Sequence, residues 1–179
     1  IQVDPNRPES HVVLASSLLA LNRIDEAIEV LRQALQSWPD LAEAHNNLGY
    51  AYHLKGERMK AIESYQAAIR ARPNYAHAYY NLGNSYMLSE QYSEAVQAYQ
   101  KAVRLNPGHV RGLYNLGQAY YCLKNLAAAE EAYERVLKVN PKHAGALYNL
   151  GIIYRDKGMT EKAVETIEKA VRLNPNLLR

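Results

Sequence analysis

Three things are scarce in this sequence: cysteine, long apolar runs and net charge. The single cysteine, Cys122, excludes an internal disulfide framework and a cysteine-rich zinc site, and it fits a reducing compartment, so the cytoplasm is the default location. The apolar stretches fall far short of the roughly 20 residues that cross a bilayer, so we expect no membrane partner. A net charge of +3 on 179 residues gives no reason to expect nucleic acid as a partner.

Side-chain patterns that support catalysis are also missing. No pair of the six histidines has the spacing and supporting ligands of a metal site. Cys122 has no neighbouring motif of a thiol nucleophile, and no glycine-rich loop that would hold a phosphate is present. We therefore expect no catalytic residues, no metal and no cofactor, and we predict that the chain is not an enzyme.

The sequence does contain an internal repeat. Six prolines recur every 34 residues, at Pro5, Pro39, Pro73, Pro107, Pro141 and Pro175. A constant period of this length is typical of proteins built from stacked structural repeats. It predicts one array of five full repeats over residues 8–177, namely 8–41, 42–75, 76–109, 110–143 and 144–177. Residues 1–7 match the end of a preceding partial repeat, and residues 178–179 form a tail.

Each repeat carries two helical patterns. Repeat positions 4, 7, 8 and 11 fall on one stripe of a first helix, and positions 20, 24 and 27 on one stripe of a second. These stripes predict an all-α fold, an α-solenoid of antiparallel helix pairs.

Glycine at position 8, as in Gly49 and Gly117, costs about 1 kcal/mol in a helix, which predicts a close approach of the second helix. Gly56 and Gly158 mark the turn inside a repeat. Basic residues recur in the last turn of the second helices, where they complement the helix dipole: Arg70, Arg104, Lys138 and Arg172.

These repeats resemble the tetratricopeptide repeat. Repeat 42–75 matches the signature of that family at His45, Leu48, Gly49, Tyr52, Ala61, Tyr65 and Pro73, and the later repeats keep the same phase. Repeat 8–41 departs from it, because Ala15 replaces the glycine and Leu18 the tyrosine. The resemblance implies a right-handed superhelix whose first helices line a concave groove for peptides or partner helices.

The candidate binding site is the face of each first helix that is not used for packing against other helices. Repeat positions 2, 5, 6, 9, 12 and 13 form this stripe, roughly opposite the core stripe. The predicted peptide-binding groove consists of Asn47, Tyr50, His77, Tyr80, Asn81, Asn84, Arg111, Tyr114, Asn115, Gln118, Tyr121, Tyr148 and Asn149. The asparagines at position 6 would either hydrogen-bond a peptide backbone or tie one repeat to the next. The tyrosines at position 5 would provide a large contact area.

This stripe favours a protein-protein interaction module or scaffold, whose partner is another protein or a peptide. The asparagine row also looks like the substrate-guiding array of O-linked N-acetylglucosamine transferases. A substrate-recognition arm of a larger enzyme is therefore one alternative. Self-association through the repeat ends is another.

Overall fold

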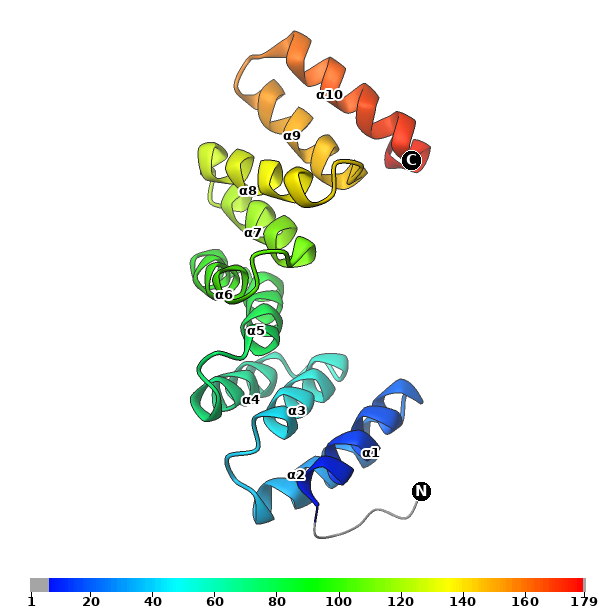
Figure 1. Cartoon of the computed structure of the whole chain (residues 1–179), viewed down its shortest axis with the longest axis vertical. Helices are drawn as coiled ribbons and strands as arrows, with labels where there is room; N and C mark the ends of the chain where they lie inside the picture. The colour runs from blue at the N-terminus through cyan, green and yellow to red at the C-terminus, as the bar shows by residue number, and fades with distance from the viewer. Residues whose placement is uncertain (1–6, 179) are drawn as a thin grey trace. The chain divides into compact units, whose positions relative to one another are not determined.

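The computed structural model describes residues 7–178, which form ten α-helices joined by short loops (Figure 1). Most of the predicted partial repeat 1–7, and Arg179 of the tail, lie outside the described residues. The helices are α1 (Pro8–Ala20), α2 (Ile24–Ser37), α3 (Ala42–Leu54), α4 (Arg58–Ala71), α5 (Ala76–Leu88), α6 (Tyr92–Leu105), α7 (Val110–Cys122), α8 (Leu126–Val139), α9 (Ala144–Asp156) and α10 (Thr160–Leu173). A 3-10 turn, Pro175–Leu178, follows. None of these helices is both long and apolar enough to span a membrane.

The helices fall into two compact units, Ile1–Gln91 and Tyr92–Arg179. In the first unit α1 packs on α2 and α3 on α4, and α5 packs on α4 (Figure 1). In the second unit α6 packs on α7, α7 on α8 and α9 on α10. Within each unit a helix mainly contacts the helices next to it in sequence, as expected for a solenoid. The predicted all-α solenoid of antiparallel helix pairs is confirmed.

The contact between paired helices is centred on a large side chain at repeat position 24. Three tyrosines at this position are among the largest fully buried side chains: Tyr65, Tyr99 and Tyr133. A Cβ atom built on Gly49 would lie 2.7 Å from the ring of Tyr65, and one built on Gly117 would lie 2.7 Å from the ring of Tyr133. A Cβ atom built on Gly151 would lie still closer to the side chain of Ile167. The predicted close approach at these glycines is confirmed, because each leaves no room for a side chain.

The turn inside every repeat has one residue in the left-handed backbone conformation. At Gly56 and Gly158 φ is +76° and +75°, which confirms the turns predicted there. Asn22, Glu90 and Lys124 occupy the same repeat position with φ of 59°, 58° and 60°. A residue with a Cβ in the left-handed conformation raises the free energy of the fold by roughly 1–2 kcal/mol relative to glycine. The turn therefore keeps its geometry in these three repeats at a cost in stability.

Replacing Glu90 by glycine should therefore stabilise the protein. We expect Glu90→Gly to raise the free energy of unfolding by about 0.5–1 kcal/mol, since relief of the left-handed strain exceeds the added entropy of the unfolded chain. The matched change Gly56→Ala should lower it by about 1 kcal/mol. Urea unfolding of both variants measures the two effects, and a destabilising Glu90→Gly would show that the turn is not strained.

Candidate functional site

The predicted groove residues lie in two sets, one in each unit. In the first unit Asn47 and Tyr50 belong to α3, and the set from His77 to Asn84 belongs to α5. In the second unit the set from Arg111 to Tyr121 belongs to α7, and Tyr148 and Asn149 belong to α9. Every one of these side chains is at least partly exposed, and Tyr50, His77 and Arg111 are the most exposed.

Three of the predicted residues of the first unit surround a small cavity. Tyr50, Asn81 and Asn84 line it together with His53 and Tyr65, and its volume is about 50 Å³. This volume accommodates a small polar group, since one water needs at least ~10–15 Å³ by the same measure. The ring of Tyr50 is 44% exposed and stacks on His53 at a centroid distance of 6.3 Å. Burial raises the pKa of Tyr65, so its hydroxyl stays protonated at neutral pH.

The asparagines of the first unit bind the preceding repeat. Asn47 donates a hydrogen bond from Nδ2 to Oγ of Ser16 in α1, at 3.0 Å. Asn81 donates from Nδ2 to Oδ1 of Asn46 in α3, also at 3.0 Å, and Asn46 is buried. The structure therefore supports the hypothesis that the asparagine row ties successive repeats together. Each of these hydrogen bonds uses one of the two N–H groups of the side-chain amide.

Asn149 makes the corresponding tie in the second unit. Its Nδ2 donates to the hydroxyl groups of Tyr114 and Tyr133, each at 3.1 Å. The ring of Tyr114 also lies 5.2 Å from the ring of His143, the residue that caps the start of α9. Burial raises the pKa of Tyr133, whereas the hydrogen bond from Asn149 lowers it by less. Tyr114, which the sequence suggests as a contact for a ligand, is thus packed between two repeats.

Tyr121 lies beside a charged pair at the end of the same face. Its hydroxyl donates to Oδ2 of Asp156 at 2.8 Å, and Arg155 contacts the other carboxylate oxygen at 2.9 Å. The hydrogen bonds from Tyr121 and Arg155 lower the pKa of Asp156, so this carboxylate remains ionised. Tyr121 and Asp156 form one more contact between successive repeats.

A second series of ties, which sequence reasoning missed, lies on the side of the second helices. In each, a polar residue of a second helix donates to the tyrosine hydroxyl 20 residues later, at repeat position 11: Arg32 to Tyr52 (2.8 Å), Gln66 to Tyr86 (3.1 Å) and Gln100 to Tyr120 (2.5 Å). The constant spacing of polar residue and tyrosine is the sequence signal that could have found it. Tyr120 is partly buried, and its hydroxyl accepts the hydrogen bond from Gln100.

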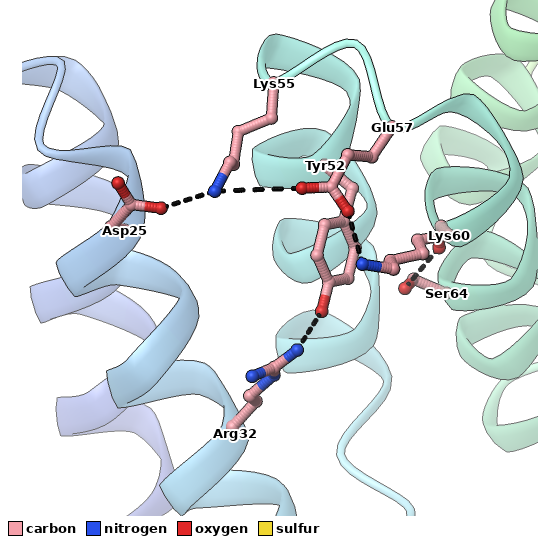
Figure 2. A network of polar contacts seen from close by, with 7 residues as sticks. All are labelled: Asp25, Arg32, Tyr52, Lys55, Glu57, Lys60 and Ser64. Carbon is pink, nitrogen blue, oxygen red and sulfur yellow. Dashed lines mark hydrogen bonds and ion pairs between the residues drawn. The ribbon is translucent and has the colours of Figure 1, made fainter.

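Figure 2 shows this tie between the first two repeats with the charged residues around it. Lys55 Nζ lies 2.6 Å from Asp25 Oδ1 and 3.7 Å from Glu57 Oε1, and Lys60 Nζ lies 2.5 Å from Glu57 Oε2. The hydrogen bond to Asp25 raises the pKa of Lys55, and the hydrogen bond from Lys60 lowers the pKa of Glu57. Exposed ion pairs of this kind add ~1 kcal/mol at most. Of these ion pairs, the one between Lys55 and Asp25 joins α2 to the following helix pair.

Residues 7–178 contain no group of three His, Cys, Asp or Glu side chains placed to hold a metal ion.

Antiparallel helix pairs with a recurring glycine contact, a recurring left-handed turn and recurring polar ties define a helical-repeat protein of the α-solenoid class. The chain belongs to the tetratricopeptide repeat family, whose models match residues 12–76, 76–109 and 114–177. Proteins of this family are generally interaction scaffolds without enzymatic activity. No curated protein sequence matches the chain significantly.

Several solved structures share the fold. YrrB, described as a tetratricopeptide protein with an unusual peptide-binding site, is 26% identical, and the match covers 98% of this chain and 90% of YrrB with a TM-score of 0.86. MamA is 28% identical over 90% of this chain and 95% of MamA, with a TM-score of 0.85. PilF from Pseudomonas aeruginosa, at 23% identity, shares the fold over 93% of this chain and 76% of its own, with a TM-score of 0.81.

Loss of the Asn149 tie should destabilise the second unit. Asn149→Ala leaves the hydroxyl of the buried Tyr133 without its hydrogen-bond donor, and we expect a loss of about 1–3 kcal/mol in the free energy of unfolding. Tyr133→Phe removes that hydroxyl, so the double variant should lose less than the two single variants together. Denaturant unfolding of the four proteins measures the coupling. Additive losses would mean that the hydrogen bond contributes nothing.

Proposed function

We propose that this chain is a protein-interaction module that binds an extended peptide or a helix of a partner protein along its first helices. The binding surface consists of the α3 and α5 face in the first unit and the α7 and α9 face in the second. The observation that carries the proposal is the cavity between Tyr50, His53, Asn81 and Asn84, with an exposed tyrosine ring at its edge.

The chemistry of this cavity suits a peptide. The side chains of Tyr50 and His53 offer flat apolar surface that loses little conformational entropy on binding, as in typical interaction hot spots. The protonated hydroxyl of Tyr65 can exchange hydrogen bonds with a backbone carbonyl or amide group. Such contacts do not depend on the peptide's side chains, so the tyrosine and histidine would provide most of the selectivity.

The groove residues contribute unequally to the proposed surface. Tyr50 and Arg111 are exposed and can reach a partner, and His77 is exposed as well. Asn47, Asn81 and Asn149 already donate to the preceding repeat, so they act mainly by holding the surface in place. The likeness to YrrB supports the peptide-binding class, because YrrB is described as having a peptide-binding site.

Selection from a random peptide library displayed on phage, followed by affinity measurement, tests the proposal. We expect Tyr50→Ala to weaken the selected peptides by about tenfold or more, a typical loss for an aromatic hot spot. Its melting temperature should stay near that of the parent, since the ring is exposed.

Met59→Ala is the matched control. Met59 is a large apolar side chain of the same repeat, 65% exposed, but it lies at the start of α4 and lines no part of the cavity. Selected peptides should bind Met59→Ala as they bind the parent chain. If Tyr50→Ala binds them equally well, or if no peptide is selected, the first-helix face of α3 and α5 is not the site.

A further inference from the structure

A larger cavity lies in the second unit, on the side of the second helices. Its volume is about 370 Å³, within the range of ligand-binding pockets. Val103 of α6 and Leu116 of α7 are buried side chains that give it an apolar floor. It includes none of the predicted groove residues, so it is a different surface from the one proposed above.

Two guanidinium groups from different helices line this cavity. Arg104 comes from the last turn of α6, and Arg135 comes from the middle of α8. Among the described residues, neither arginine has a hydrogen bond or an ion pair, whereas Arg72 and Lys157 are paired with carboxylates. Two unpaired arginines in the lining, together with the buried Val103 and Leu116, give the cavity both positive charge and apolar surface.

The helix dipole and a local ion pair do not explain why both arginines are at this cavity. Arg104 belongs to the basic row that complements the helix dipole, but Arg135 lies a turn away from that row. Lys138, the basic-row residue of the same helix, does not line the cavity. Glu131 is the single acidic residue of the lining, and it forms no ion pair with Arg135 although it precedes it by one helical turn. With Arg104 and Arg135 against Glu131, the lining therefore keeps a net positive charge.

We infer that this cavity binds an acidic segment of a partner protein, with a glutamate or aspartate carboxylate between Arg104 and Arg135. Guanidinium groups match the geometry of a carboxylate and form strong charge-assisted hydrogen bonds with it. The apolar floor receives the aliphatic side chain next to the acidic residue. The hydroxyl of Tyr120, held by Gln100 at 2.5 Å, lines the same cavity and contributes a further polar contact.

Titration of the full chain with two short peptides tests this inference. The probes are N-acetyl-leucyl-glutamyl-leucine amide and its glutamine counterpart, followed through the backbone amide NMR signals. We expect the glutamate peptide to shift the signals of Tyr120 and Ala132, and the glutamine peptide to bind about tenfold more weakly or not at all. Equal binding of the two peptides would overturn the inference.

Charge variants identify the residues that carry the binding. Arg104→Gln and Arg135→Gln should each weaken the glutamate peptide by about tenfold, and Glu131→Gln should strengthen it. Lys138→Gln removes the same charge outside the cavity and should have little effect, and Tyr50→Ala should have none. An equal loss of affinity in Lys138→Gln would show that only the net charge of the protein matters, and it would contradict the inference.

Inorganic phosphate that displaces the peptide at equal concentration would also contradict the inference, since the cavity would then be a simple anion site.

Discussion

The contact between a large side chain at repeat position 24 and the bare backbone of a glycine at position 8 determines how the two helices of a repeat pack. In the repeats with Gly49 and Gly117, a tyrosine ring occupies the space that a Cβ would need. The glycine costs about 1 kcal/mol in helix propensity, but it lets the ring become fully buried. This contact fixes one face of the first helix, and the proposed binding surface lies on the opposite face.

Polar contacts between successive repeats form the next level of the structure. Asparagines tie the first helices together, and the tyrosines at position 11 receive hydrogen bonds from the preceding second helix. A single such bond contributes only ~1 kcal/mol, so their effect lies in repetition and in the alignment they impose. This arrangement explains why a row of amides recurs on the groove side. Much of the row holds the surface in place, whereas Tyr50 is exposed on it.

The sequence predicts those parts of the fold that depend on a single repeat. The period of 34 residues, the helical stripes and the glycines at position 8 predict the helix pairs and their closest contact. The sequence could not predict which side chains of neighbouring repeats are in contact, because periodicity describes only the faces of a single helix. The same asparagine position donates to Ser16 in one repeat and to Tyr133 in another. The cavity beside Arg104 and Arg135 was missed for the same reason, since its lining comes from three helices.

The left-handed turns show another limit of prediction from sequence. Glycine reveals the turn at Gly56 and Gly158, whereas Glu90 and Lys124 adopt the same conformation without any signal from the residue type. Residue type alone does not predict the turn at these two positions. Strain that packing imposes is visible only in the structure.

The free energy of unfolding of Gly117→Ala tests the central contact most directly. If the ring of Tyr133 occupies the space beside Gly117, the added methyl group must displace it, and the variant should lose about 1–3 kcal/mol. A helix without this contact would instead gain about 1 kcal/mol from replacing glycine by alanine. The two outcomes have opposite signs, so a stabilised Gly117→Ala would contradict the account of how each helix pair is held together.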